Sequence, residues 1–183
     1  MARAVRIRID KPPAPWMGRL HVFLARRAPG LMRAVTRLNR RTPQRLRARL
    51  RAQVALTNLE LFARGDPAGL EIYHPDIEFV GMQQWTQFGL PERAVGRAAL
   101  LEYSRKWAEI FDSVEYRQVE LIDIGDVLVG KWLMTGTVRG LTTRLEAGQL
   151  IRLAPDGRVI HQQDFGSWAE AVAAAGLPPE VAR

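Results

Sequence analysis

Asp164 is the residue of this chain whose type and setting best suit acid–base chemistry. It lies in the segment 156–177, DGRVIHQQDFGSWAEAVAAAGL, on a strand that follows a tight turn. A helix comes next, opened by Ser167 and Glu170 in the spacing of a capping box. A carboxylate among apolar neighbours has its charged form disfavoured, which raises its pKa toward the range useful for proton transfer. The pattern predicts a cavity wall that carries an acid or base. The alternative is a structural carboxylate that hydrogen-bonds backbone at the strand end.

Four other residues are candidates for contact with a ligand. Asn58 shares the core-facing stripe of a predicted helix, and a buried amide needs hydrogen-bond partners, either in the protein or on a ligand. Trp132 and Met134 alternate with glycines along one strand, a pattern typical of a roomy pocket wall or of plain core. Trp85, in a long Gln-rich segment, would form a lid.

Signals for a metal or a cofactor are missing from the sequence. His74 and His161 are far apart and show no metal-ligand spacing. The chain has no cysteine, which excludes disulfides and thiolate chemistry, and it has no Gly-rich phosphate loop or nucleophile elbow. We therefore expect neither a metal nor a cofactor.

Charge divides the chain into two parts. Residues 1–51 carry fourteen Arg, one Lys and one Asp, a net charge of +14, whereas residues 52–183 carry twelve basic and eighteen acidic residues, a net charge of −6. We predict a basic Arg-rich arm over 1–45, a domain over 46–177 and a short tail over 178–183. The preference for Arg, Ala and Gly is typical of a GC-rich, hence bacterial, coding sequence.

The basic arm contains a helical pattern with three possible roles. Its apolar positions are Trp16, Leu20, Phe23 and Leu24, with arginines on other faces. The apolar stripe would pack on the domain, or the arm would lie on an anionic membrane surface, or the arginines would bind nucleic acid phosphates. Nucleic acid is the least favoured of the three. We expect a cytoplasmic protein, peripheral at the membrane if the second role holds.

The acidic part has the element order of an α+β domain, helices first and an antiparallel meander after them. Turn residues separate its strands. The predicted elements are helices over 46–64, 67–72 and 97–111, a loop over 81–96, and strands over 77–80, 114–124, 127–138, 143–154 and 158–165.

This order resembles the SnoaL-like group of the nuclear-transport-factor-two-like superfamily, which includes ketosteroid isomerases. The resemblance covers about residues 51–177 and rests on LFARGDPAGLEIYHPDIEF, VGRAALLEYSRKWAEIF, ELIDIGD, DGRVI and SWAEAVAAAGL. It implies a conical domain, in which a curved antiparallel sheet wraps a pocket that helices close, and pairing into homodimers through the sheet. The fold hosts many unrelated activities.

Similarity to the polyketide cyclases of that group implies an acid or base at Asp164. The tryptophan that precedes this carboxylate in the cyclases is Gln163 here, and a second aspartate is Ser167. The cyclases also use a histidine on the preceding strand, where this chain has Gln149 and aliphatic residues. Gln149 would then act as a polar group that orients the ligand.

Two functions follow from these residues. A non-catalytic module that binds a small apolar molecule or dimerises is slightly favoured, because the histidine is missing. The alternative is an enzyme of the cyclase, isomerase, dehydratase or hydrolase type with Asp164 as general acid or base. We also predict a homodimer, because Val127, Val129 and Leu133 on the outer sheet face are too apolar to leave in water.

Overall fold

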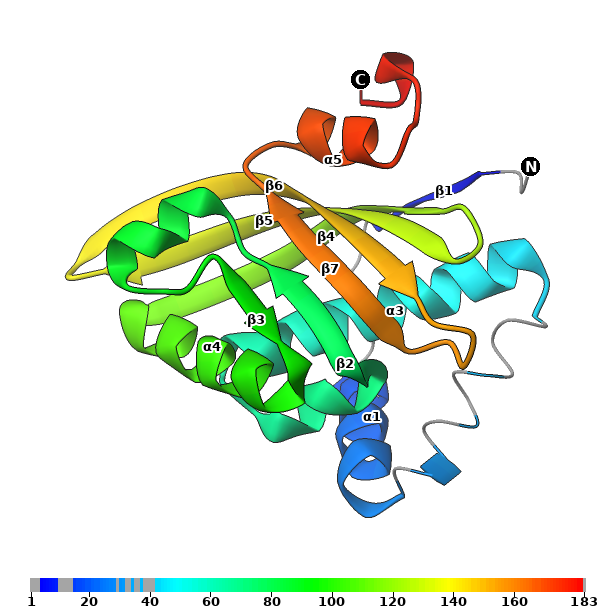
Figure 1. The fold of residues 1–183 in the computed structure, drawn as a ribbon, viewed down its shortest axis with the longest axis horizontal. Helices are drawn as coiled ribbons and strands as arrows, with labels where there is room; N and C mark the ends of the chain where they lie inside the picture. Colours follow the sequence, from blue (N-terminus) through cyan, green and yellow to red (C-terminus); the bar gives the residue numbers. More distant parts are fainter. Residues whose placement is uncertain are drawn as a thin grey trace.

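The computed structural model describes residues 4–9, 15–28, 30, 31, 34, 37 and 42–182, and a curved sheet forms the centre of this part (Figure 1). The seven strands lie in the order β1-β4-β5-β6-β7-β2-β3. Their bounds are β1 (Val5–Arg8), β2 (Tyr73–Val80), β3 (Arg93–Val95), β4 (Ser113–Asp123), β5 (Val127–Val138), β6 (Leu141–Leu153) and β7 (Val159–Phe165). The helices are α1 (Pro15–Arg27), α3 (Gln44–Ala63), α4 (Gly96–Ile110) and α5 (Trp168–Ala174), with 3-10 helices η1 (Pro67–Ile72), η2 (Gln83–Phe88) and η3 (Pro179–Ala182).

Strands β4, β5 and β6 form the predicted meander. Their residues alternate between the two faces, so that Trp132 of β5 lies opposite Gln118 of β4 and Ala147 of β6 on the inner face. Arg139 and Gly140, both at positive φ, make the tight turn between β5 and β6. The α+β class with a curved, mostly antiparallel sheet is confirmed.

The sheet is mixed rather than wholly antiparallel, which corrects the sequence prediction. β2 pairs in parallel with β7, and Phe79 lies opposite Gln162. β2 begins at Tyr73, four residues before the predicted strand. The predicted loop over 81–96 in fact contains η2 and β3. Periodicity missed these elements because η2 and β3 are each too short to show a repeating pattern.

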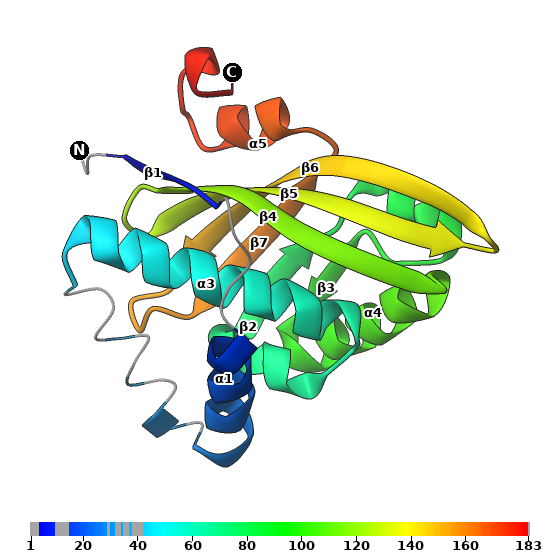
Figure 2. The ribbon, with the colours of Figure 1, turned by 180° about the vertical axis from the view of Figure 1, so that it is seen from behind.

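Helices cover both faces of the sheet (Figures 1 and 2). α3 and α4 lie against the inner, concave face and enclose the main core, whereas α5 packs on the outer face. α5 thereby covers Val127 and Val129 within the same chain, and Leu133 is left partly exposed. The two valines are therefore no evidence for a dimer interface, because α5 already covers them. The homodimer itself stays a prediction.

The first strand joins the described part of the arm to the sheet. β1 pairs antiparallel with β4, and Arg6 forms an ion pair with Glu120 across that pair. Ile9 continues into the main core. The predicted division at residue 45 stays a prediction, and α3 itself begins at Gln44.

A buried carboxylate fastens the start of α3 to the end of β4. Arg47 donates two hydrogen bonds to Asp123, at 3.1 and 3.0 Å, and Arg51 donates one at 2.8 Å. Arg51 also donates to the backbone oxygen of Gly125 at 2.6 Å. Two of the arginines at the end of the basic segment are therefore structural, because Asp123 is fully buried between them.

Helix α1 does not pack on the domain by its apolar stripe. Trp16, Leu20 and Phe23 are exposed, and only Leu24 of the predicted stripe packs against the core. The small residues Ala25 and Val22 make the contact instead, against α3 and η1. The first of the three sequence interpretations is therefore wrong for this helix.

Candidate functional site

Asp164 lies on the inner face of β7, directly opposite Gln149 of β6. Gln149 Nε2 donates a hydrogen bond to Asp164 Oδ1 at 3.1 Å, and Gln162 Nε2 donates to the same oxygen at 3.4 Å. The described part of the chain gives the other oxygen, Oδ2, no hydrogen bond. One oxygen is thus held in place by two amides, while the second is left for another partner.

Burial raises the pKa of Asp164 to about 6, and the hydrogen bonds from Gln149 and Gln162 lower it by less. The residue is partly accessible to water, because it lines an internal hollow, yet protein surrounds it. A carboxyl group with a pKa near 6 exists in both protonation states close to neutral pH, which suits it to take up and return a proton.

A chain of hydrogen bonds connects Asn58 to Asp164. Asn58 Nδ2 donates to Tyr73 Oη at 3.0 Å, and Tyr73 Oη donates to Gln162 Oε1 at 2.9 Å. Because the oxygen of Gln162 is the acceptor in this chain, its nitrogen must face Asp164. The chain therefore fixes the orientation of the Gln162 amide as a donor to the carboxylate.

Aromatic rings form most of the wall around Asp164. Tyr116 stands between two tryptophans, with ring centroids 5.6 Å from Trp107 and 5.5 Å from Trp132. Burial and the charge of Asp164 raise the pKa values of three tyrosines around it, so these hydroxyls stay protonated donors. The cavity is lined by Asn58, Leu59, Phe62, Tyr73, Phe79, Trp85, Tyr103, Trp107, Tyr116, Trp132, Gln162 and Asp164.

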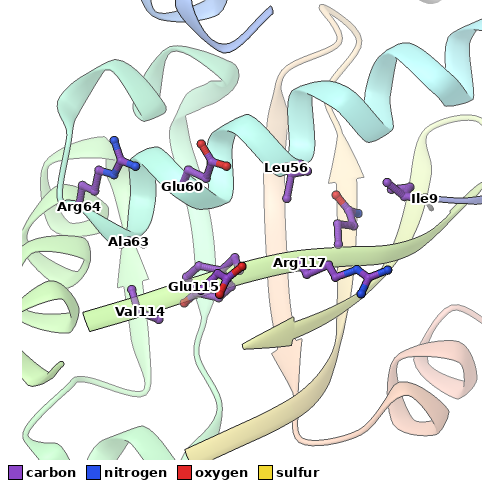
Figure 3. Close-up of a pocket in the computed structure, with 10 residues that line it drawn as sticks. Ile9, Leu56, Glu60, Ala63, Arg64, Val114, Glu115 and Arg117 are labelled. Atoms are coloured by element: carbon purple, nitrogen blue, oxygen red, sulfur yellow. The ribbon is translucent and has the colours of Figure 1, made fainter. Parts of the chain in front are cut away.

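The space at Asp164 is small, and two larger hollows adjoin it. The cavity measures about 20 Å³, room for about one water molecule. A second hollow of about 90 Å³ shares Asn58, Tyr73 and Gln162 with it and also reaches Gln149. A third, of about 550 Å³, lies between α3 and β4 and shares Tyr116. Figure 3 shows charged side chains of α3 and β4 around this third hollow.

The structure brings most of the predicted site residues together. Asn58, Trp85, Trp132 and Asp164 line one cavity. Gln149 contacts Asp164 and lines the adjoining hollow.

Met134 and Gly136 were predicted as part of the pocket wall, but in the structure this part of β5 belongs to the packed core. Met134 lies two residues along β5 from Trp132, buried in the core, and does not line the described hollows. The ring of Phe111 fills the space beside Gly136 that the sequence pattern assigned to a pocket. A contact between Met134 and a ligand stays a prediction.

Tyr73, Tyr116 and Gln162 are among the site residues that the sequence analysis did not predict. Gln162 could have been predicted from the sequence, because residues two apart on a strand share a face and Gln162 stands two residues before Asp164. Tyr73 gave no such signal, since its contact with the site comes from the parallel pairing of β2 with β7. Tyr116 stands between exposed residues in the first half of β4, as Val114 does, so alternation along this strand was the signal that could have found it.

One buried donor in the wall has no partner. The Nε1 atom of Trp132 is inaccessible and makes no hydrogen bond with the described residues. A buried N–H without an acceptor is unfavourable by roughly 1–3 kcal/mol.

Among the described residues, no group of three or more His, Asp or Glu side chains is placed to hold a metal ion. His74 and His161 lie near the acidic residues Asp76 and Glu78, at 3.6 and 3.7 Å. Both pairs are partly exposed and separate from Asp164.

A family model for the SnoaL-like domain matches residues 55–162. Solved structures of several proteins are similar in fold. TerC, co-crystallised with polyporic acid, is 24% identical with a TM-score of 0.56, over 68% of this chain and 95% of that one. An NTF2-like protein of unknown function from Burkholderia pseudomallei is 21% identical with a TM-score of 0.56, over 66% and 93%.

A third solved structure is a hypothetical protein with a ketosteroid isomerase-like fold from Catenulispora acidiphila, in complex with trimethylamine. It is 15% identical with a TM-score of 0.50, over 66% of this chain and 89% of that one. The comparison with curated proteins gave no match.

Proposed function

The chain belongs to the SnoaL-like domain family, and on this premise we propose that its interior binds a small, largely apolar cyclic molecule with which Asp164 exchanges a proton. The observation that carries the proposal is the carboxyl group itself. It lies among aromatic rings, its pKa is raised to about 6, and two amides hold only one of its oxygens. Structural relatives bind small molecules.

The walls suggest the class of ligand. The faces and edges of Trp107, Tyr116 and Trp132 suit a flat ring. The unpaired Nε1–H of Trp132 suits a carbonyl oxygen on that ring. A cyclic ketone meets both requirements.

Its chemistry follows from the same groups. The Asp164 carboxylate takes a proton from the carbon next to the carbonyl, and the electron pair moves onto the carbonyl oxygen to give an enolate. The Trp132 N–H stabilises that oxygen, and the carboxyl group then returns the proton to carbon. Isomerases and cyclases share this first step.

A ring needs more room than the cavity at Asp164 offers, so binding requires a wall residue to move. Tyr116 is the shared wall between Asp164 and the hollow of about 550 Å³. We propose that a ligand enters there when the Tyr116 ring swings aside. Tyr116→Ala should then speed ligand association at least about threefold. Leu128→Ala, in the wall of the other adjoining hollow, should leave the association rate unchanged.

Exchange of carbon-bound hydrogen tests the proposal without knowledge of the natural substrate. Cyclic ketones are incubated with the protein in D₂O, and loss of the proton next to the carbonyl is followed by NMR. We expect exchange that rises with pH around an apparent pKa near 6, because the carboxylate is the active form. Asp164→Asn should abolish exchange and keep affinity within about tenfold.

Trp132→Phe provides the matched test of the donor, because it keeps a flat ring and removes the N–H. Ketone affinity should fall at least about fivefold, whereas affinity for the ring hydrocarbon should change little. Equal losses for ketone and hydrocarbon would contradict the assignment of Trp132 as a donor.

Non-catalytic binding is the second candidate. Two observations favour it: the hydrogen-bond chain through Tyr73 is already complete, and the Gln149 region contains no histidine. A ketone that raises the melting temperature of the protein without any exchange of its hydrogen would select this function.

A further inference from the structure

Helix α1 carries its large apolar side chains on the side that faces away from the protein. Trp16, Leu20 and Phe23 follow a spacing of four and three residues, so they share one face of the helix. Their exposed fractions are 57%, 46% and 59%. The opposite side, with His21 and Ala25, is buried. The helix is thus attached by its small residues and displays its large ones.

An apolar contact and an ion pair attach α1 to the domain. Ala25 packs with Leu61 of α3 and Ala68 of η1, and Arg26 forms an ion pair with Asp66 at 2.6 Å. Figures 1 and 2 both show α1 extending from the α3 and η1 side, away from the sheet. The apolar face of α1 therefore points away from the domain.

Arginines border this apolar face. Arg27 lies one turn beyond Phe23 on the same face, and Arg19 lies one turn before Phe23. Both are exposed. The segment around α1 is also rich in basic residues: residues 1–51 carry a net charge of +14, although four of their arginines pair with acidic residues of the domain. An apolar strip with basic residues at its border matches the boundary between lipid headgroups and acyl chains.

Two other partners fit the face less well. A symmetric contact with a second copy would bring the same patch together twice, and would place arginines against arginines. A nucleic acid would satisfy the arginines through its phosphates but leave Trp16, Leu20 and Phe23 with no reason to be exposed on one face. The combination of apolar and basic groups favours an anionic bilayer.

We propose that α1 docks the protein on the surface of an anionic membrane. Trp16, Leu20 and Phe23 enter the boundary between headgroups and acyl chains, and Arg19 and Arg27 contact lipid phosphates. The helix lies in the plane of the surface: within the described residues no helix is long and apolar enough to cross a membrane. This docking is independent of the chemistry at Asp164.

Binding of the full chain to vesicles tests the proposal. Vesicles of phosphatidylcholine with phosphatidylglycerol are compared with vesicles of phosphatidylcholine alone by co-sedimentation. We expect binding to the anionic vesicles, weaker binding as salt increases, and little binding to the neutral ones. Salt-insensitive binding, equal binding to both vesicles, or no binding would overturn the proposal.

Matched variants separate the apolar contribution from a general effect of hydrophobicity. Leu20→Ser/Phe23→Ser should weaken vesicle binding at least about tenfold, because both side chains leave the boundary region. Val95→Ser/Leu141→Ser is the control, since these side chains are also exposed, at 61% and 77%, on other elements. The control should bind within about twofold of the unmodified protein.

The arginines have their own matched pair. Arg19→Gln/Arg27→Gln should weaken binding about tenfold or more. Arg144→Gln/Arg152→Gln, which removes two exposed arginines of β6, should have little effect. If the α1 arginines matter while Leu20→Ser/Phe23→Ser binds normally, the surface binds anions alone and the membrane proposal fails. Binding to single-stranded RNA with that same pattern would assign the surface to nucleic acid.

Trp16 supplies a direct signal from the docking face. The other four tryptophans, at 85, 107, 132 and 168, are each at most 8% exposed. A shift of emission to shorter wavelength with anionic vesicles, lost in Trp16→Phe, would place this side chain in the boundary region. Unchanged emission from a bound protein would contradict docking through α1. A dimer that dissociates in Leu20→Ser/Phe23→Ser would assign the face to a second copy.

Discussion

Replacing Asp164 by asparagine should have little effect on stability below about pH 4 and should stabilise the protein increasingly as pH rises from about 4 to about 6. The pKa is raised from 3.8 to about 6 in the folded state. Between these values the folded protein binds more protons than the unfolded chain, so its free energy of unfolding falls as pH rises from about 4 to about 6. Above about pH 6 the loss is complete.

The magnitude follows from the shift. About two pKa units, at about 1.4 kcal/mol each, give roughly 3 kcal/mol as an upper bound for the unfavourable contribution of the charged group. The side-chain amide of the Asp164→Asn variant would stay neutral at every pH, and its oxygen would still accept from Gln149. We therefore expect this substitution to raise the free energy of unfolding by about 1–3 kcal/mol near pH 7.5. Near pH 4 the two proteins should differ little.

Urea unfolding of both proteins across this pH range measures the difference. A rise of 1 kcal/mol corresponds to about 2–4 °C in melting temperature for a chain of this length. Asp76→Asn is the matched control, because the Asp76 side chain is 85% exposed and should change stability by less than about 0.5 kcal/mol. If Asp164→Asn instead lowers stability by about 1–3 kcal/mol near pH 7.5, the carboxylate is a structural hydrogen-bond acceptor and the reasoning is refuted.

Three further substitutions or truncations test how the site is supported. Gly148→Ala should lower stability by about 1–3 kcal/mol in a thermal melt, because an added Cβ would clash with the Cβ of Ala171 in α5. Gly166→Ala is the control and should be near neutral, because its added Cβ would have no atom closer than 3.9 Å outside its chain neighbours. Asp123→Ala should lower the free energy of unfolding by about 3–5 kcal/mol, since it leaves the two arginines of α3 without their buried partner, and a smaller loss in urea titrations would show that water replaces it. Deletion of residues 1–41 should leave a cooperatively melting but less stable domain, because β1 and its ion pair with β4 are lost; a broad, non-cooperative melt would show that these residues belong to the folding unit.

Helices, strands and the faces of their side chains were predicted well, because they depend on residues that are close together in the sequence. The predicted helix over 97–111 is α4 over 96–110, and the strand over 127–138 is β5. Alternation along a strand placed Trp132 and Met134 on one face, whereas the place of Asp164 at a pocket was implied by the resemblance to the cyclases. Asn58 was identified because an amide interrupted an apolar helical stripe.

Features that depend on distant parts of the chain were not predictable in this way. The parallel pairing of β2 with β7 brings Tyr73 to Gln162, and nothing in either segment alone indicates it. The outward face of α1 was missed for a different reason. Periodicity shows that Trp16 shares a face with Leu20, but a helix can attach by either face, and here the smaller residues fit against η1.

The pairing of β2 with β7 also has a consequence for how the protein folds. These strands are joined by a chain segment of about eighty residues that contains α4 and the whole meander, so closing them carries a large loop entropy. Until β7 pairs with β2, the Asp164 carboxylate is solvated and keeps the pKa of an exposed aspartate. Over the same period the Tyr73 hydroxyl lacks its hydrogen-bond acceptor, the side-chain oxygen of Gln162. We expect the acidity of Asp164 to change late in refolding, and NMR of this carboxyl group after rapid dilution from urea would time the closure of the sheet.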